Sequence, residues 1–338
     1  MSNKIKIFIV DDSAYIRNFL KSNLKDEFDI VGEAKDGIEA LKKVYTLNPD
    51  LVILDLMMPK MSGDMVAKAI MSNKPLPIIM LTSLSDSEIK KSFNLLESTV
   101  VEIVKKPMEL DSNFVNNLTK KIKICKNLKI NKVSESLSQY VTMPNNITLK
   151  KNYALTIGVS TGGPKTLRNL IPFLTSIENL PIFLIQHIDL EFEKGYSEWI
   201  QEFSQKEVIL LSKKTVLEDK LYLCSGKFNL DLTNNSNRLY IELLQAEPNQ
   251  LYFPCIDKIV TNVAYRLKDR LIHLQLTGLG NDGQEGALIA HKLGATIICQ
   301  KPESAIASSM PKAVADFADY ILELHEIKEK ILNILSGQ

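Results

Sequence analysis

The sequence predicts an α/β protein built from two doubly wound, parallel-sheet domains, the second of which also contains a β-hairpin. Three observations lead to this fold class. The chain has 338 residues, 45% of them hydrophobic, which is enough for two domains of about 100 to 200 residues each. Short apolar runs alternate with longer amphipathic stretches, as in parallel sheets covered by helices. This alternation is interrupted over residues 127–151, which are rich in Asn, Ser and Lys.

The first block, residues 1–126, predicts one complete parallel-sheet domain. Its apolar runs are IKIFIV, LVILDL, LPIIML and VVEIV, and amphipathic stretches such as AYIRNFLKSNLK and GIEALKKVYTL lie between them. Residues 112–126 (SNFVNNLTKKIKICK) fit a closing helix. The following residues, 127–151, lack sustained periodicity, and we interpret them as a linker.

The second block, residues 152–338, repeats the α/β pattern. Strands are expected at YALTIGV, PIFLIQ, LIHLQL and ATIICQ, and each but the last is followed by a plausible helix. Between the second and third of these, KLYLCSGKFNLDL and RLYIELL alternate in polarity and bracket the polar turn TNNSN. Two alternating segments around a polar turn predict a β-hairpin.

Composition excludes several classes of protein. The 41 basic and 40 acidic side chains leave a formal net charge of +1, so no global field attracts the chain to nucleic acid or to anionic lipid. The four cysteines lie far apart without a C-x-x-C pair, which disfavours a zinc site and a disulfide framework. No segment has the length of a signal peptide or of a membrane span. We therefore expect a cytoplasmic protein without direct membrane insertion.

Three carboxylates are expected at one edge of the first sheet. Asp11 and Asp12 follow the first strand, and Asp55 lies near the end of LVILDL. Carboxyl groups that converge repel one another unless a hard cation neutralises them, and Mg²⁺ suits an all-oxygen site. Thr82 and Lys106 follow the third and fourth strands, so a hydroxyl and an ammonium join the same edge. The set suits a phosphoryl group. The alternative is that the aspartates only cap helices or occupy a turn.

The residues around this edge resemble the receiver domain of bacterial response regulators, from residue 4 to about 125. The matching motifs are VDDS, LDLMMPKMSG, the threonine of MLTS, and KKP. The resemblance implies a flavodoxin-like fold in which Asp55 takes a phosphoryl group from a chemotaxis histidine kinase. It also implies that Asp12, Asp55 and the backbone of Met57 bind Mg²⁺, while Asp11 acts through water.

The same resemblance gives Thr82 and Lys106 the role of sensing the acyl phosphate. The sequence departs from the receiver pattern just before the lysine, where the family usually has Gly-Ala and then an aromatic residue. Thr99, Val100 and Ile103 stand at those positions. Phosphate acceptance is therefore better supported by the sequence than phosphate sensing.

The second domain carries a candidate nucleophile at the end of its first strand. Ser160 lies in Gly-Val-Ser-Thr-Gly, which matches G-x-S-x-G, a pattern that exposes a serine on a sharp strand-to-helix turn. The pattern alone is weak, because a glycine-rich turn before a helix also suits a phosphate group of a nucleotide. A serine needs a base, and His187 is the histidine that ends a strand, PIFLIQ.

A carboxylate that could orient this histidine follows the strand LIHLQL. Asp282 lies among glycines in TGLGNDG and could complete a serine, histidine and aspartate set. The alternative is that Asp282 only caps the helix that follows it. The chain order Ser160, His187, Asp282 differs from that of ordinary α/β hydrolases, in which the histidine comes last. A different, Rossmann-like hydrolase fold is expected.

Across nearly the whole chain, the motifs resemble the CheB-type protein-glutamate methylesterases of bacterial chemotaxis. The matching stretches are IGVSTGGP, LIQHI, PCID, LTGLGNDGQEG and the later Met-Pro pair. The resemblance implies hydrolysis of γ-glutamyl methyl esters on methyl-accepting chemoreceptors, release of methanol, and in some members deamidation of receptor glutamines. It makes Ser160 the nucleophile, His187 the base and Asp282 its orienting group, with Leu279 and Thr161 near the oxyanion; no cofactor is implied for the esterase.

Two segments depart from this family. Ser225, Phe228 and Asn229 occupy altered positions within LCSGKFNL, and ASSMP replaces an aromatic-Gly-Met-Pro ending at residues 307–309. Two other functions stay open from the sequence. The chain could be a non-enzymatic response regulator whose second domain only binds a receptor or kinase, or it could bind a nucleotide at the STGG turn.

Overall fold

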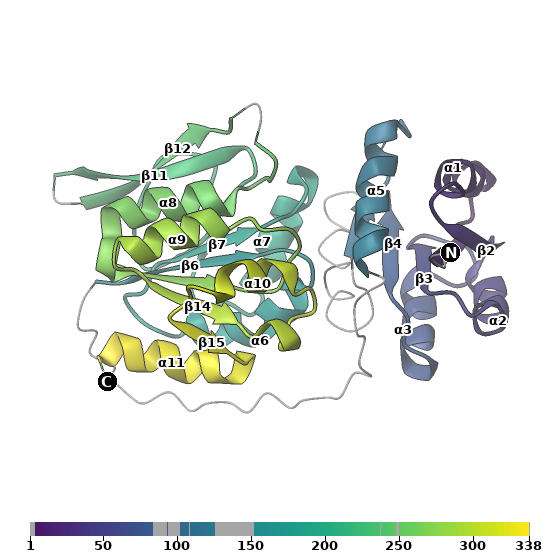
Figure 1. Ribbon diagram of the computed structural model, residues 1–338. Coiled ribbons are helices and arrows are strands. Elements are labelled where there is room, and N and C mark those ends of the chain that lie inside the picture. The colour runs from purple at the N-terminus through teal and green to yellow at the C-terminus, as the bar shows by residue number, and fades with distance from the viewer. Residues whose placement is uncertain are drawn as a thin grey trace. The chain divides into compact units, whose positions relative to one another are not determined.

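The computed structural model describes residues 4–83, 93, 102–107, 109–125, 152–236, 238–247 and 250–337. The chain divides into two compact units, coloured along the sequence in Figure 1. Elements β1 to α5 belong to the first unit and β6 to α11 to the second. The expected linker at 127–151 lies outside the described residues, so the division into 1–126, 127–151 and 152–338 stays a prediction.

The described part of the first unit contains a five-stranded parallel sheet in the order β2-β1-β3-β4-β5. Helices α1 and α5 pack together on one face, and α2 and α3 pack on the other (Figure 1). The elements are β1 (Lys6–Val10), α1 (Ala14–Leu24), β2 (Asp29–Ala34), α2 (Gly37–Leu47), β3 (Leu51–Asp55), α3 (Gly63–Asn73), β4 (Ile78–Thr82), β5 (Glu102–Lys105) and α5 (Ser112–Cys125). The predicted doubly wound fold is confirmed here.

The described part of the second unit contains a seven-stranded parallel sheet in the order β15-β14-β13-β6-β7-β10-β8. Helices α8 and α9 cover one face, and α6 and α11 lie on the other (Figure 1). Its strands and helices up to the middle of the unit are β6 (Ala154–Val159), α6 (Gly163–Leu174), β7 (Ile182–Gln186), α7 (Glu193–Gln201), β8 (Val208–Leu210), β9 (Thr215–Val216), β10 (Leu221–Leu223), β11 (Phe228–Asn235) and β12 (Arg238–Gln245).

The remaining strands and helices of this unit are α8 (Ile256–Leu267), β13 (Leu271–Gln275), α9 (Gln284–Lys292), β14 (Thr296–Gln300), α10 (Ser309–Ala315), β15 (Tyr320–Leu322) and α11 (Leu324–Ser336). Short 3-10 turns lie at Leu190–Phe192, Lys268–Arg270 and Pro302–Ser304. The antiparallel hairpin β11-β12 packs over α8 and pairs with β9.

The structure corrects three details of the second unit. The apolar segment Leu221–Leu223 is not part of the hairpin, because its three buried side chains join the main sheet between β7 and β8. The expected turn TNNSN is mostly strand, since β11 continues to Asn235, which pairs with Arg238. The last predicted strand is followed by helix α10 after all, a short helix that the sequence pattern did not indicate.

The sheet of the second unit grows in both directions from its first strand, β6. On one side lies β7 and on the other lies β13. Loops after these three strands leave the same edge of the sheet, and such a change of strand order opens a crevice where ligands bind in α/β folds. Ser160 follows β6, His187 follows β7, and Asp282 follows β13.

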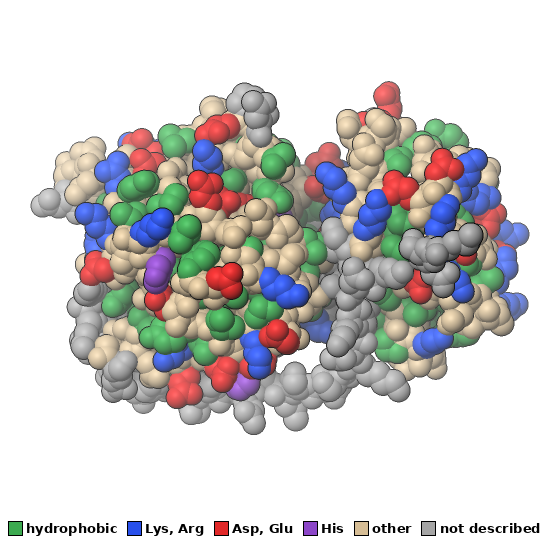
Figure 2. Space-filling model, in the orientation of Figure 1, with side chains coloured by type: hydrophobic (Ala, Val, Ile, Leu, Met, Phe, Trp, Pro, Cys, Tyr) green, Lys and Arg blue, Asp and Glu red, His purple; other side chains and the backbone are tan. Residues whose placement is uncertain are grey.

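The surface of the second unit is mixed in charge on the face that Figure 2 shows, where acidic and basic side chains are interspersed with hydrophobic ones. Within the described ranges, no helix combines the length and the apolar character needed to cross a membrane.

Candidate active site

Ser160 lies on a tight turn between β6 and α6 that only small neighbours allow. Its N–H donates to the carbonyl of Thr277 on the adjacent segment (3.0 Å), and its carbonyl accepts from the N–H of Gly163 (2.8 Å). Gly162 has a φ of +79°, a conformation that favours glycine. A Cβ at Gly163 would lie 2.2 Å from Oε1 of Gln186. The turn holds the serine, which is 9% exposed, at the edge of the sheet.

Gln186, the last residue of β7, ties the serine to the histidine. Its Nε2 donates to the carbonyls of Ser160 (3.1 Å) and His187 (3.0 Å), and its Oε1 accepts from the Tyr196 hydroxyl (3.2 Å). The His187 N–H also donates to the carbonyl of Val159 (3.0 Å). Gln186 was not predicted as a site residue, although a polar residue at the end of the apolar run PIFLIQ is a signal of one.

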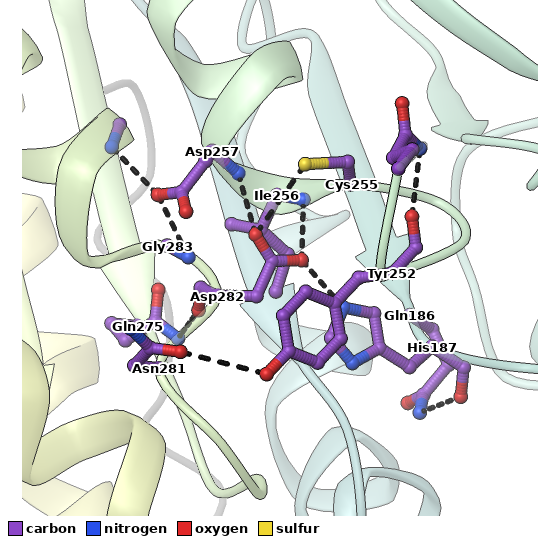
Figure 3. A network of polar contacts seen from close by, with 12 residues as sticks. Gln186, His187, Tyr252, Cys255, Ile256, Asp257, Gln275, Asn281, Asp282 and Gly283 are labelled. Atoms are coloured by element: carbon purple, nitrogen blue, oxygen red, sulfur yellow. Dashed lines mark hydrogen bonds and ion pairs between the residues drawn. The ribbon is translucent and has the colours of Figure 1, made fainter. Parts of the chain in front are cut away.

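Asp282 contacts the imidazole of His187 directly, with 2.7 Å between Oδ2 and Nε2. Its carboxylate also accepts from the N–H groups of Ile256 (2.8 Å) and Asp257 (2.9 Å) at the start of α8 (Figure 3). The helix that follows Asp282 has Gly283 as its N-cap. The alternative that Asp282 only caps its own helix is therefore wrong; it caps α8 and contacts the histidine.

Asp257, in the first turn of α8, makes the reciprocal contacts with the start of α9. Its Oδ1 accepts from the N–H groups of Gly283 (3.0 Å) and Gly286 (2.7 Å), in the first turn of α9 (Figure 3). Burial raises the pKa of Asp257 to about 6, against the effect of these donors. Burial also acts to raise the pKa of Asp282, but the hydrogen bond and charge of His187 and the N–H groups of α8 outweigh it and hold that pKa below its usual value. Asp282 is thus ionised, and it loses its proton at a lower pH than Asp257 does.

The contact with Asp282 decides which ring nitrogen of His187 is free to react. An ionised carboxylate accepts from Nε2–H, so the neutral imidazole has its lone pair on Nδ1. Within the described residues the Ser160 hydroxyl makes no hydrogen bond, and the Leu279 N–H donates none. Active-site hydrogen bonds are often completed only when substrate binds. The arrangement provides a hydroxyl, a base and an N–H donor at one edge of the sheet.

Two further predicted features lie around the nucleophile. Thr161 is buried next to it. Gly278 lies against it so closely that a Cβ there would be 2.8 Å from Cβ of Ser160 and 2.1 Å from the sulfur of Met310. Met310, of the Met-Pro pair that matches the family, donates its N–H to the carbonyl of Gly278 (3.1 Å). The altered residues 307–309 contact the same glycine, since the carbonyl of Ala307 accepts from the Gly278 N–H (2.9 Å) and the Ser309 hydroxyl donates to the Gly278 carbonyl (3.2 Å).

His273, the other buried histidine near the site, is structural. Its Nδ1 is 3.0 Å from the Thr156 hydroxyl and its Nε2 is 2.9 Å from Oε1 of Gln275. Burial lowers its pKa to about 4, so the ring is neutral. Gln275 in turn donates to the backbone carbonyl of Asp282 (3.2 Å). This buried series of hydrogen bonds supports the loop that carries Asp282.

The altered segment around residues 224–229 is connected to His187 through a series of side-chain contacts. Ser225 donates to the buried carboxylate of Glu193 (2.7 Å), whose pKa is raised by burial. Asn229 donates through Nδ2 to Oε1 of Gln250 (2.9 Å). Gln250 donates to the carbonyl of Tyr252 (2.7 Å), and the Tyr252 ring stacks on His187.

The acidic cluster of the first unit lies at the carboxyl edge of its sheet. One oxygen each of Asp11, Asp12 and Asp55 lie within 4.8 Å of one another. The Lys106 ammonium contacts Asp11 (2.7 Å) and Asp55 (2.9 Å). Burial raises the pKa of Asp55 to about 6, although Lys106 acts in the opposite direction. Three converging carboxylates, two of them buried, fit a small divalent cation that prefers oxygen ligands.

The other predicted residues of this cluster lie as follows. The Met57 N–H is 3.4 Å from Oδ1 of Asp55, and Thr82 is fully buried at the end of β4. Ile103 is a buried residue of β5, whereas residues 99 and 100 lie outside the described residues. The first helix has Ser13 as its N-cap, so Asp11 and Asp12 are not its caps.

Two family models match the chain. The model described as "CheB methylesterase" matches residues 155–331, and the model described as "Response regulator receiver domain" matches residues 7–116. The first contains Ser160, His187 and Asp282, and the second contains the acidic cluster.

Curated relatives match over almost their full length. A protein-glutamate methylesterase/protein-glutamine glutaminase 1 of Carboxydothermus hydrogenoformans is 34% identical over 97% of this chain and 98% of the relative. One of the same name from Syntrophomonas wolfei is 31% identical over 98% and 99%. The crystal structure of the Thermotoga maritima CheB methylesterase catalytic domain matches 54% of this chain and 99% of that domain, with 28% identity and a TM-score of 0.51.

Proposed function

The chain belongs to the CheB methylesterase family, and on this premise we propose that it hydrolyses γ-glutamyl methyl esters on chemoreceptors and releases methanol. The hydrolysis serves sensory adaptation in chemotaxis and is regulated by phosphorylation of the N-terminal receiver domain. The observation that carries the proposal is the 2.7 Å contact of His187 with the buried Asp282, beside the strand that ends at Ser160. Neither a receptor-binding module nor a nucleotide site requires this contact.

In the proposed mechanism, Ser160 Oγ attacks the ester carbonyl carbon while Nδ1 of His187 takes the hydroxyl proton. Asp282 stabilises the imidazolium and keeps the proton on Nε2 in place. The carbonyl oxygen becomes an oxyanion that the Leu279 N–H binds, with Thr161 beside the nucleophile. A donor at such a position contributes about 3 kcal/mol to the transition state.

Collapse of the tetrahedral intermediate breaks the bond to the methoxy oxygen, which leaves as methanol with the proton from Nδ1. A water molecule then attacks the glutamyl-serine ester and gives a proton to Nδ1 of His187. As the bond to Ser160 Oγ breaks, His187 returns that proton to Oγ, and the glutamic acid product leaves as a carboxylate after it loses its proton to solvent. The same residues can act on a glutamine side chain, in which case the leaving group is ammonia. The relatives named glutaminase support this second substrate.

The receiver domain supplies the regulation. Asp55 accepts the phosphoryl group from a chemotaxis histidine kinase. Asp12, Asp55 and the backbone of Met57 would hold Mg²⁺, with Asp11 acting through water, and a cation bound there would supply charge neutralisation for the phosphoryl oxygens. The second contact of Lys106, to Asp55 at 2.9 Å, supports its role as a cation that contacts the acyl phosphate; Thr82 supplies a hydroxyl.

Ser160→Ala tests the chemistry. We expect methanol release from methylated receptor membranes to fall by about 10⁴-fold or more and labelling by a serine-directed phosphonate to be lost. Ser197→Ala is the matched control, because that serine is half-buried on α7 and, among the described residues, its hydroxyl bonds only within its own helix; the rate of this variant should equal that of the unchanged chain. Equal rates for Ser160→Ala and the unchanged chain, or retention of a nucleotide at this turn, would refute the esterase.

Asp55→Asn tests the regulation separately. A small-molecule phosphodonor with Mg²⁺ should stimulate methanol release by the unchanged chain, and this stimulation should be absent in Asp55→Asn while the basal rate persists. Asp26→Asn changes an exposed carboxylate of the same unit and should leave the stimulation intact. Undiminished stimulation of Asp55→Asn would exclude Asp55 as the phosphorylated residue.

A further inference from the structure

Tyr252 lies flat on the imidazole of His187. The two ring centroids are 5.2 Å apart and the ring planes differ by 6° (Figure 3). Tyr252 belongs to the segment that precedes α8, and it follows none of the three strands that carry the proposed nucleophile, base and carboxylate. Neither the serine motif nor the strand-end positions pointed to it. A parallel, offset stack of this kind is a favoured aromatic arrangement.

The Tyr252 ring is held at both of its ends. At its backbone, Gln250 donates to the carbonyl (2.7 Å), and Asn229 donates to Gln250 (2.9 Å). At its tip, the hydroxyl is 3.5 Å from Oδ1 of Asn281, the neighbour of Asp282. Gly280 has a φ of +86°, and a Cβ there would be 2.5 Å from the tyrosine oxygen. The tyrosine is therefore seated against the loop that carries the catalytic carboxylate.

The imidazole itself has little other restraint. Its one hydrogen bond within the described residues runs from Nε2 to Asp282, and the side chain is only 14% exposed. A ring with one hydrogen bond can still rotate about that bond, which would carry Nδ1 away from Ser160. A parallel ring at 5.2 Å allows one plane for the imidazole.

The electrostatics of the stack also favour the protonated imidazole. The face of an aromatic ring is negative and attracts a cation placed over it. The imidazole becomes a cation when it takes the serine proton, and Asp282 is the charged group in contact with it in the described part of the chain. An aromatic face on the ring adds to this stabilisation without adding a competing hydrogen bond.

From this geometry we propose that Tyr252 is a positioning residue for the base of the reaction, which fixes the plane of the His187 ring and stabilises its protonated form. The inference rests on the proposed function, in which His187 is the base. Asn229, one of the residues altered relative to the family, also belongs to the series of contacts that holds Tyr252 in position.

The test compares variants that keep or remove the aromatic face. Tyr252→Phe keeps the ring and should retain methanol release from methylated receptor membranes within about threefold. Tyr252→Leu removes the face and should lower kcat by about 10- to 100-fold with little change in KM, because a misplaced base costs rate rather than binding. Tyr265→Leu is the matched control: that tyrosine is 57% exposed on α8, and its loss should change neither constant.

A pH profile distinguishes positioning from mere filling of space. Loss of the aromatic face should move the acid limb of kcat/KM to lower pH by about half a pH unit in Tyr252→Leu and not in Tyr252→Phe. The titration midpoint of the His187 ring, followed by NMR in the Ser160→Ala background, should move by the same amount. If Tyr252→Leu does not fold, Tyr252→Gln serves in its place.

The outcomes separate the two proposals. If Ser160→Ala is inactive while Tyr252→Leu matches the unchanged chain in kcat and pH profile, the esterase stands and the role of Tyr252 is refuted. If Tyr252→Leu and Tyr252→Phe lose activity equally with an unshifted acid limb, the ring does not position the base. If Ser160→Ala is fully active, the proposed function itself fails, and the NMR titration still tests the stack.

Discussion

Replacing Asp282 by asparagine tests the proposed mechanism most sharply, because each carboxylate oxygen has defined partners. Oδ2 accepts from His187 (2.7 Å) and Ile256 (2.8 Å), and Oδ1 accepts from Asp257 (2.9 Å). An amide has only one accepting oxygen. In either orientation of the new amide, Asp282→Asn therefore places an NH₂ group against at least one buried N–H of α8, and that N–H loses its acceptor.

The expected magnitudes follow from these contacts. One buried donor without a partner costs about 1 to 3 kcal/mol of stability. If the NH₂ group faces His187, the imidazole accepts at Nε2 and holds its proton on Nδ1, where it cannot take the serine proton. In the other orientation the imidazolium loses its charged partner. We expect kcat to fall by about 10⁴-fold.

Asp257→Asn is the matched control. Its Oδ1 alone accepts from Gly283 and Gly286, and asparagine retains that oxygen. We expect a rate within about threefold of the unchanged chain and a free energy of unfolding within about 0.5 kcal/mol of it.

Methanol release, guanidinium unfolding and the ¹⁵N shifts of the His187 ring measure the rate, the stability and the tautomer respectively. An Asp282→Asn variant that hydrolyses within tenfold of the unchanged chain would refute the role of Asp282. So would an equal loss of activity in both asparagine variants, since of the two aspartates Asp282 contacts the imidazole and Asp257 does not in the described part of the chain.

Three further predictions concern buried groups of the second unit. Burial lowers the pKa of His273 to about 4; the unfolded chain therefore binds a proton between pH 6.5 and 4 that the folded chain excludes. The buried carboxyl groups of Asp55 and Asp257, with pKa values raised to about 6, act in the opposite direction in the same window, so the test is a difference: as the pH falls, the free energy of unfolding in urea should fall by up to about 3 kcal/mol more in the unchanged chain than in His273→Gln. An equal pH dependence in the two chains would contradict this. Gly278→Ala should lower the free energy of unfolding by about 1 to 3 kcal/mol and abolish most of the activity, because its Cβ would meet Ser160 and Met310. Met310→Ala in the same chain should recover part of the stability. Absence of any recovery would exclude the steric cause. Burial raises the pKa of Cys255 to about 12, so iodoacetamide should label this thiol only after unfolding, and rapid labelling of the folded chain would show that it is accessible.

The parallel strands were predictable because they are buried on both faces. Strands β1, β3 and β4 are almost completely buried, so each appears as a continuous apolar run. Strand β2 was missed, since it lies at the edge of the sheet and its sequence DIVGEA is only partly buried. The same holds for β15, an edge strand of three partly exposed residues. An edge strand has one neighbour and therefore a weaker apolar signal.

The site residues also divide into some that were predictable from the sequence and others that were not. Ser160 and His187 directly follow apolar strands, and strand ends meet at one edge of a parallel sheet, so their proximity was predictable. Gln186 and Tyr252 act through side-chain contacts to residues from other elements. No periodicity encodes such contacts, because they depend on where α7 and the segment before α8 lie in space.

The exchange of caps between α8 and α9 shows why the proposed orienting carboxylate could not be distinguished from an ordinary cap. Asp282 lies just before α9 and accepts from N–H groups of α8, whereas Asp257 lies in the first turn of α8 and accepts from N–H groups at the start of α9. A local sequence pattern assigns each aspartate to its own helix, because capping residues normally precede the helix they cap. With the partners exchanged, N–H groups of α8 hold the Asp282 carboxylate from a position 26 residues away in the sequence, and Oδ2 also contacts His187. The N–H groups of α8 keep Asp282 ionised without consuming that contact. A capping role and the proposed orienting role are therefore compatible in one side chain, because the buried hydrogen bonds of the cap provide the rigidity that an orienting carboxylate requires.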